Sequence, residues 1–345
     1  MPSFLDLVPL VADKIVPPVL IVLGPIRPVL ELVGALGTPD VACLQFDVHQ
    51  AKRLGGALAE RGLSNDVIAA GDVWDAERSF ETVVIPSLVG ADRELKLDLL
   101  EQCYHVLRPG GRLIVFSEYE RDILFHKAMK NYYGACSETP KHDGGTAFWS
   151  VRNPADPPRE RRRHRITYRA RVGESPSLAF ESWPGTFSYG RFDAGSRAML
   201  EVAKLEPNDR VLDLGCGDGS VGILAGQRLG EGGRITFVDS SLRAMKLTEH
   251  NAKANGAKNY ELMASSTLDD LPRDAFDVVL ANPPYYANSE VGRLFIDTAR
   301  DVLKPNGRLY FVTKMPVQTI PIIVETFGDV ESFENRGYTV VIARR

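Results

Sequence analysis

The two halves of this 345-residue chain resemble each other in the order and spacing of short motifs. Residues 19–22 (VLIV) and 211–214 (VLDL) are apolar runs that lie 192 positions apart. Residues 106–113 (VLRPGGRL) and 302–309 (VLKPNGRL) match at an offset of 196. Further matches in the same order begin at Leu44 and Thr236, at Phe80 and Phe276, and at Gly145 and Gly337. Five ordered matches at a nearly constant offset predict two copies of one architecture.

Within each copy, short apolar runs alternate with stretches that have a helical pattern, such as residues 241–255 and 291–303. This alternation is typical of βαβ units, which build a mostly parallel sheet covered by helices. Gly145 and Gly337 stand in turns ahead of the last run of each copy, which predicts a terminal hairpin with one reversed strand. We therefore expect an α/β fold with two sandwiches of the same kind in tandem.

A proline- and arginine-rich segment separates the two copies. We expect a first domain over residues 1–153, a stiff linker over 154–165 and a second domain over 166–345. Residues 152–171 contain eight Arg against two acids, a net charge of +6, so the rest of the chain carries −10 of the total −4. Arg161 and Arg163 are candidates for contacts with RNA phosphates, which bind without reading sequence. The alternative is a solvated linker.

Composition excludes several classes of protein. The net charge of −4 gives no overall sign of nucleic-acid binding. Four cysteines without a C-x-x-C pair, and six histidines without ligand spacing, predict no metal site and no disulfide framework. The apolar stretch over residues 16–36 is interrupted by prolines and charges, so we expect no membrane span and no signal peptide. We expect a cytoplasmic protein that is a monomer.

A glycine-rich loop follows the predicted strand at residues 211–214. It reads D-x-G-x-G-x-G, from Asp213 through Gly215 and Gly217, and Asp239 ends the next predicted strand. Glycines allow a sharp turn against a ligand, and an acid at the end of the next strand accepts hydrogen bonds from ribose hydroxyls. Asp213 and Asp218 would repel a pyrophosphate but suit an ammonium and a sulfonium, which favours S-adenosylmethionine over NAD or FAD. The alternative is that these carboxylates only cap the following helix.

A second motif, Asn282-Pro283-Pro284-Tyr285, directly follows the apolar run at residues 276–280. It should lie at the same sheet edge as the glycine loop, because ligands bind at the carboxyl ends of parallel strands. The Asn282 amide oxygen and the Pro283 carbonyl are two acceptors that suit one NH2 group. Tyr285 can stack on a flat substrate. We expect catalytic roles for Asn282, Pro283 and Tyr285.

A third stretch, residues 183–196 (WPGTFSYGRFDAGS), narrows the interpretation. With the two motifs above, it resembles class I S-adenosylmethionine-dependent methyltransferases, and within them the bacterial ribosomal RNA guanine-N2 methyltransferases of the RsmC and RlmG group. The resemblance implies seven-stranded Rossmann-like folds and methylation of a guanine N2 amine in small-subunit ribosomal RNA or in the assembled subunit. It also implies that Phe187, Gly195 and Ser196 cover the cofactor.

The remaining site assignments follow from order along the chain. Ser265 or Ser266 is expected at the adenine edge of the cofactor, because this segment follows the next predicted strand. Pro284, Tyr285 and Tyr286 are expected on the substrate side, and Tyr286 stands where the small-subunit enzymes typically have His.

The first copy lacks the motifs. Ile21, Leu23 and Pro25 stand where the second copy has Asp213, Gly215 and Gly217. Pro86-Ser87 replaces the Asn-Pro pair. We therefore expect a degenerate first domain that binds no cofactor, and the resemblance implies that it supports RNA recognition or folding.

Three other functions fit part of the pattern. A protein-glutamine N5 methyltransferase shares N-P-P-Y because an amide nitrogen poses the same chemical problem, but the degenerate first domain and the P-G-x-F-S segment argue against it. An adenine-N6 methyltransferase shares the same motif. A non-catalytic RNA-binding assembly factor would keep the cofactor site for stability alone.

Overall fold

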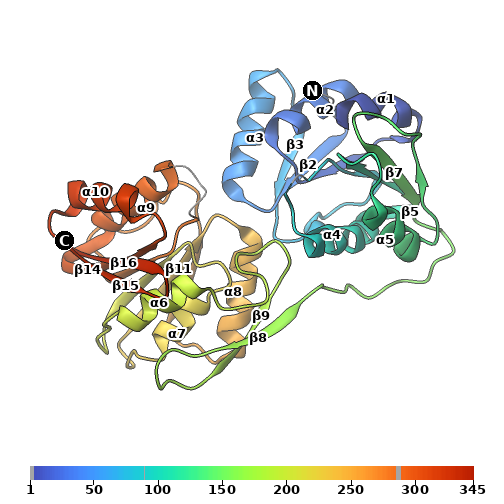
Figure 1. The fold of residues 1–345 in the computed structure, drawn as a ribbon. Helices are drawn as coiled ribbons and strands as arrows, with labels where there is room; N and C mark the ends of the chain where they lie inside the picture. Colours follow the sequence, from blue (N-terminus) through green and yellow to red (C-terminus); the bar gives the residue numbers. More distant parts are fainter. Residues whose placement is uncertain (1–3, 89, 285–288) are drawn as a thin grey trace. The chain divides into compact units, whose positions relative to one another are not determined.

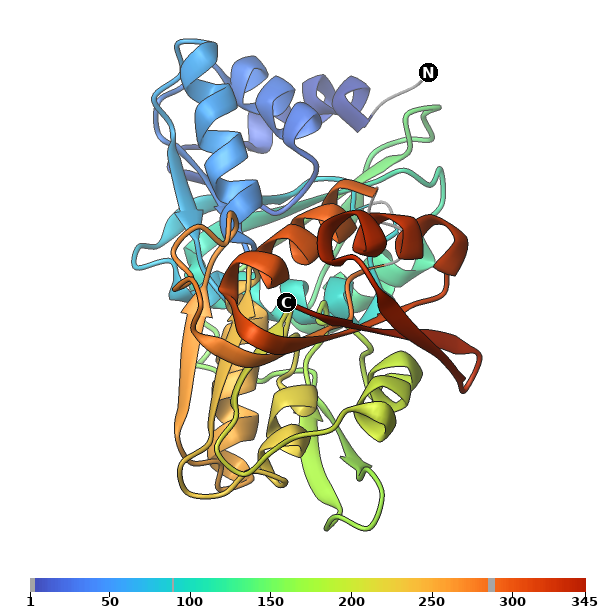
Figure 2. The same cartoon turned by 90° about the vertical axis from the view of Figure 1, so that its left-hand side faces the viewer.

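The computed structural model describes residues 4–88, 90–284 and 289–345. Its contacts divide the chain into two units, Met1–His164 and Arg165–Arg345. Each unit contains one seven-stranded sheet with helices on both faces (Figures 1 and 2).

The first unit contains strands β1 to β7 and helices α1 to α5. The strands are β1 (Val19–Val22), β2 (Val41–Gln45), β3 (Asp66–Ala69), β4 (Phe80–Ile85), β5 (Leu107–Ser117), β6 (Ser137–Glu138) and β7 (Thr146–Val151). The α-helices are α1 (Val8–Val11), α2 (Ile26–Leu36), α3 (Val48–Glu60), α4 (Arg93–Val106) and α5 (Ile123–Tyr133). Short 3-10 helices are η1 (Phe4–Leu7), η2 (Ala12–Lys14) and η3 (Val73–Asp75).

The second unit contains strands β8 to β16 and helices α6 to α10. The strands are β8 (Ile166–Ala170), β9 (Leu178–Ser182), β10 (Arg210–Leu214), β11 (Arg234–Asp239), β12 (Tyr260–Ala264), β13 (Phe276–Ala281), β14 (Leu303–Thr313), β15 (Val330–Asn335) and β16 (Tyr338–Arg344). The helices are α6 (Ala194–Val202), α7 (Ser220–Gly226), α8 (Leu242–Ala254), α9 (Ser289–Val302) and α10 (Pro316–Phe327).

The two large sheets have the same strand order. It is β3-β2-β1-β4-β5-β7-β6 in the first unit and β12-β11-β10-β13-β14-β16-β15 in the second. In each sheet the strand that follows the last turn, β7 or β16, pairs antiparallel with its neighbours. The expected α/β fold with two tandem, mostly parallel sheets and terminal hairpins is therefore confirmed. The small antiparallel sheet of β8 and β9 is an addition that the sequence patterns did not predict.

Each sheet separates two apolar cores, because neighbouring side chains on a strand point to opposite faces. On β10, Val211 packs into the core formed with α6, α7 and α8, whereas Leu212 packs into the core formed with α9 and α10. Both side chains are fully buried. A central strand that is apolar on both faces fits the near-continuous apolar runs that predicted it.

The expected linker packs against the first unit as far as His164. The Arg159 guanidinium lies 4.0 Å from the centre of the Tyr104 ring. Arg163 makes two hydrogen-bonded contacts with the carboxylate of Asp72, at 2.7 and 2.8 Å, and Asp72 is only 1% exposed. The segment is therefore bound by specific contacts, and Arg163 has a structural partner that the charge pattern did not predict.

We predict that Arg163→Ala lowers the free energy of unfolding of the first unit by about 3 kcal/mol, because it leaves a buried carboxylate without its ion-pair partner. Arg162→Ala, a change at the exposed neighbouring position, should cost less than about 0.5 kcal/mol. Urea unfolding followed by fluorescence measures both, since the Arg163 guanidinium lies 5.2 Å from the centre of the Trp74 ring. Equal losses in the two variants would contradict this role.

Candidate active site

The carboxyl ends of three parallel strands meet at one edge of the second sheet. Leu214 of β10 lies opposite Val238 of β11 on one side and opposite Ala281 of β13 on the other. The loops that follow these strands therefore leave the sheet next to one another. A small pocket lies there, and its walls include Phe187, Ser196, Asp213, Gly215, Gly217 and Asn282. The structure thus brings the glycine loop, the Asn-Pro-Pro motif and the P-G-x-F-S segment to one place.

The glycine loop turns sharply beneath this pocket. Gly217 has φ +58° and Gly219 has φ +78°, values in the left-handed region that favours glycine. A Cβ atom on Gly219 would lie 2.7 Å from Cγ2 of Thr248, so the position has no room for a side chain. The Gly217 amide donates a hydrogen bond to Oδ2 of Asp239 at 2.9 Å. The loop is therefore fixed against the end of β11 and exposes backbone to the pocket.

Asp213 is a buried carboxyl on the wall of the pocket. Its Oδ2 accepts a hydrogen bond from the Gly222 amide at 2.8 Å, and the residue is 3% exposed. The pKa of Asp213 is raised to about 7: burial is the main cause, the Gly222 hydrogen bond lowers the pKa in part, and the nearby carboxylates of Asp218 and Asp239 add to the rise. A cationic ligand in the pocket would favour the ionised form of this group.

Asp218, like Asp213, is buried on the wall of the pocket. Its Oδ1 accepts a hydrogen bond from the amide of Ser220, the first residue of α7, at 3.0 Å. Its Oδ2 accepts a hydrogen bond from the hydroxyl of Tyr168 on β8 at 2.5 Å. Burial raises the pKa of Asp218. Both carboxyls thus accept an amide hydrogen bond from the first turn of α7 and both line the pocket, so the capping alternative applies to the two alike. Tyr168 is a partner that no sequence motif indicated.

The Cys216 thiol lies within the same loop and is buried. Its Sγ is 3.5 Å from Oγ1 of Thr248, and burial raises its pKa well above the usual value. A thiol held in its neutral form is a poor nucleophile. The small volume of the side chain explains its place in the loop.

Asn282 is held by two residues at the start of α6. Its Nδ2 donates one hydrogen bond to Oδ2 of Asp193 at 2.8 Å and another to Oγ of Ser196 at 2.9 Å. Pro283 is buried and Pro284 is exposed. Tyr285 and Tyr286, which sequence analysis placed on the substrate side, lie outside the described residues. Asp193 is a site residue that sequence reasoning missed, although the D-x-G-S pattern contained it.

The P-G-x-F-S segment, which precedes α6 in the chain, forms part of the pocket wall. Phe187 is 51% exposed and forms part of the pocket wall. Gly195 and Ser196 are buried in the first turn of α6, and of these two only Ser196 lines the pocket. Arg243 of α8 is 1% exposed, and its Nε donates a hydrogen bond to the Pro184 carbonyl at 2.8 Å. This buried guanidinium fixes the segment and was not predicted from sequence.

The serines expected at the adenine edge follow β12. The Ser265 amide donates a hydrogen bond to the Asp239 carbonyl at 3.1 Å, and its Oγ accepts one from the Leu268 amide at 3.1 Å. Ser266 is half-buried. Neither serine lines the pocket described above. The structure therefore places Ser265 beside Asp239, with its hydroxyl turned to its own loop.

Arg161 and Arg163 belong to the first unit. Arg161 is exposed, and its guanidinium lies 5.8 Å from the centre of the Trp74 ring. Arg163 is engaged by Asp72. The proposed contact with RNA phosphates therefore has an exposed side chain at Arg161, whereas the Arg163 guanidinium is already bound to a carboxylate.

The corresponding place in the first unit has different residues and different contacts. Pro86 stands where the second unit has Asn282, and its ring packs on Gly24, where an added Cβ would lie only 2.5 Å from the proline Cγ. Asp47, the counterpart of Asp239, accepts a hydrogen bond from the Gln50 amide at 2.9 Å and caps α3. At these two positions the first unit therefore has a proline that packs on a glycine and a carboxylate that caps a helix.

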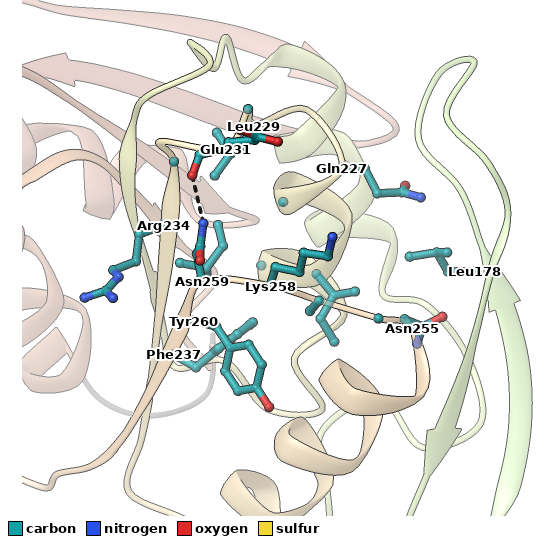
Figure 3. A pocket seen from close by; sticks show the side chains of 18 residues that line it. Leu178, Gln227, Leu229, Glu231, Arg234, Phe237, Asn255, Lys258, Asn259 and Tyr260 are labelled. Carbon is teal, nitrogen blue, oxygen red and sulfur yellow. Dashed lines mark hydrogen bonds between the residues drawn. The ribbon is translucent and has the colours of Figure 1, made fainter.

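A second pocket of the C-terminal unit lies at the opposite end of its strands (Figure 3). It is lined near the beginnings of β11 and β12 by residues that include Arg234, Lys258 and Tyr260. Asn259 donates a hydrogen bond to the Glu231 carbonyl at 2.8 Å on its rim. None of the site residues expected from sequence lines it. Ligands of open α/β sheets bind at the other end of the strands, so this pocket is separate from the candidate site.

Among the residues that the structure describes, no group of three or more His, Cys, Asp or Glu side chains is arranged to hold a metal ion. No helix among them has both the length and the apolar character that a membrane crossing needs.

A family model described as "Methyltransferase small domain" matches residues 177–342. The C-terminal unit belongs to this methyltransferase family. The ribosomal RNA small subunit methyltransferase C of Marinomonas sp. is 25% identical over 315 residues, which are 86% of each chain. The protein of the same name from Pseudomonas aeruginosa (strain UCBPP-PA14) is 29% identical over 247 residues, 69% of this chain and 72% of that one. The resemblance expected from the motifs is confirmed.

One solved structure resembles both units. It is the Thermus thermophilus 16S rRNA N2 methyltransferase RsmC, determined in complex with AdoMet and guanosine. The TM-score is 0.76 at 23% identity, and the match covers 99% of this chain and 92% of that one. At this level of identity the likeness concerns the fold, which each of the two units shares with that enzyme.

We predict that Asp213 makes the stability of the ligand-free protein depend on pH. A carboxyl whose pKa rises from 3.8 to about 7 on folding binds more protons in the folded state, so its contribution is full below about pH 4 and is lost as the pH rises through 7. Relative to Asp213→Asn, the wild type should lose up to about 1.4 kcal/mol of unfolding free energy per pH unit in that window. Urea titrations of both proteins between pH 4 and 8 measure it, and a constant difference would contradict the assignment.

Proposed function

We propose that this protein is an S-adenosylmethionine-dependent methyltransferase that acts on the exocyclic N2 amine of a guanine in small-subunit ribosomal RNA. The observation that carries the proposal is the pocket where the glycine loop, Asp213 and the oriented amide of Asn282 meet. The names of the curated relatives and the ligands of the solved relative support the same chemistry. A ribosomal substrate would place the activity in the cytoplasm, and we propose that the protein acts as a monomer.

The residues of the pocket fit the cofactor. The methionine end would lie along the glycine turn beside Asp213, Gly215 and Gly217, where the buried carboxyl of Asp213 would complement an ammonium or sulfonium. Asp239 would hold the ribose, as acids at this strand end do. Ser265 or Ser266 would meet the adenine edge, and the covering residues would be Phe187, Gly195 and Ser196.

Asn282 and Pro283 would hold the substrate amine. A guanine N2 is a weak nucleophile, because its lone pair is shared with the ring. The Asn282 side-chain oxygen and the Pro283 carbonyl would accept its two N–H bonds, which favours a pyramidal nitrogen and stabilises the positive charge that develops there. When bound, S-adenosylmethionine supplies a methyl group whose bond to sulfur breaks as the N2 lone pair forms the N–C bond, which leaves S-adenosylhomocysteine and releases one proton from the amine to water.

The remaining assignments concern the RNA. Tyr285 would stack on the base, with Pro284 and Tyr286 on the same side. Arg161 is exposed and would contact phosphates. We leave Arg163 out of this role, because its guanidinium is committed to the buried carboxylate of Asp72.

Labelled methyl transfer to RNA from cells that lack the gene, followed by nucleoside mass spectrometry, tests the proposed function. The wild type should produce N2-methylguanosine. Asn282→Ala should lower turnover by roughly 100-fold, as the loss of one electrostatic stabiliser does in other enzymes, while S-adenosylhomocysteine still binds in a calorimetric titration.

Each other outcome contradicts a stated part of the proposal. Label found only in protein would favour glutamine N5 methylation, and N6-methyladenosine would favour the adenine reaction. Cofactor binding without transfer to any RNA would favour a non-catalytic assembly factor. Near-normal turnover of the Asn282 variant would remove that residue from the chemistry.

We further propose that the first unit binds no cofactor, since the Pro86 ring packs on Gly24 where the pocket would open. Titration of the full-length protein with S-adenosylhomocysteine should therefore reach one equivalent. Asp239→Ala should weaken that site, whereas Asp47→Ala, the matched change in the first unit, should leave both affinity and stoichiometry unchanged. Two equivalents for the wild type would refute the proposal.

A further inference from the structure

Asp193, Ser196 and Asn282 form a triangle of hydrogen bonds beside the pocket. Asp193 Oδ2 accepts from the Ser196 amide at 2.7 Å and from Asn282 Nδ2 at 2.8 Å. Ser196 Oγ accepts from the same Nδ2 at 2.9 Å. Both N–H bonds of the Asn282 amide are thus directed at α6, which begins almost ninety residues earlier in the chain.

These contacts select one orientation of the amide. An asparagine side chain has a donor end and an acceptor end of nearly equal size, so packing alone does not distinguish them. Rotation by 180° would replace Nδ2 with Oδ1 and turn an oxygen lone pair toward the Asp193 carboxylate. It would also exchange a charge-assisted hydrogen bond for repulsion between two acceptors. The carboxylate therefore keeps the donor end against α6 and the acceptor end on the opposite side.

We propose that Asp193 is a positioning residue that sets which end of the Asn282 amide faces the reacting amine. This inference rests on the proposed function, because the acceptor end is what an NH2 substrate needs. Asp193 acts through Asn282 and does not itself contact the amine. Ser196 completes the arrangement by accepting the second N–H bond. With Asp193 and Ser196 both bound to Nδ2, the Asn282 amide presents its oxygen to the substrate. The site therefore favours a substrate group that donates a hydrogen bond and disfavours a carbonyl at that position.

Asp193 also caps α6 through the Ser196 amide, so the test has to separate capping from positioning. Asp193→Ser keeps a good capping residue but is too short to reach Asn282. Asp193→Asn can place its Oδ1 where Oδ2 now accepts both hydrogen bonds. A matched control is Asp47→Ser in the first unit, where Asp47 caps α3 by the same bond to the third helical residue, Gln50.

We expect Asp193→Ser to lower kcat by about 10- to 100-fold, a part of the effect of losing a whole stabilising group. The Kd for S-adenosylhomocysteine and the KM for RNA should stay within about threefold, and Asp193→Asn should recover most of the wild-type kcat, since it restores the acceptor. Asp47→Ser should leave kcat unchanged. Thermal unfolding of each variant shows that capping is retained.

Results on kcat can overturn the inference in two ways. One is wild-type kcat in Asp193→Ser, and the other is an equal loss of kcat in the Ser and Asn variants, which would show that the shared acceptor geometry does not matter. Both differ from failure of the proposed function, in which the wild-type protein itself would transfer no methyl group to RNA. A parallel loss of kcat and of S-adenosylhomocysteine binding would also overturn it, because positioning of Asn282 predicts an effect on kcat alone.

Discussion

The candidate site depends on the parallel register of three neighbouring strands. β10 lies between β11 and β13, with Leu214 opposite Val238 and Ala281. This pairing brings the glycine loop, Asp239 and Asn282 to one edge, although they are far apart in the chain. A slip of one residue would turn every side chain of the strand to the other face of the sheet. The apolar cores on both faces oppose such a slip, since Val211 and Leu212 are each fully buried on opposite sides.

Two acidic side chains lie buried at the same edge of the sheet. Asp213 and Asp218 are both buried, and burial raises the pKa of each. Backbone amides offset part of this cost: Gly222 donates to Asp213, and Ser220 donates to Asp218. Such groups are stabilised further when a cation enters. The loop is thus preorganised for a positively charged ligand, which is the property that distinguishes it from a pyrophosphate-binding loop.

The two units show how one architecture can carry a site or lack one. Their sheets have the same strand order, but Pro86 stands at the position of Asn282 in the first unit, where its ring lies against Gly24. Asp47 remains at the end of its strand but only caps a helix. Because function depends on the residues at the strand ends, duplication of the fold does not duplicate the site. The proposed activity therefore rests on the second unit, and the proposed contact of Arg161 with RNA lies on the first.

The sequence by itself determined the repeat, the class of fold and the main members of the site. Apolar runs, glycines and prolines act on the backbone near them, so their spacing predicts strands and turns without knowledge of distant contacts. It did not determine which side chains meet across the fold. The bonds from Asn282 to Asp193, from Tyr168 to Asp218 and from Arg163 to Asp72 span 89, 50 and 91 residues. Only tertiary packing decides such pairs, because a hydrogen bond forms between whichever groups the cores bring within about 3 Å, and no local pattern records that distance.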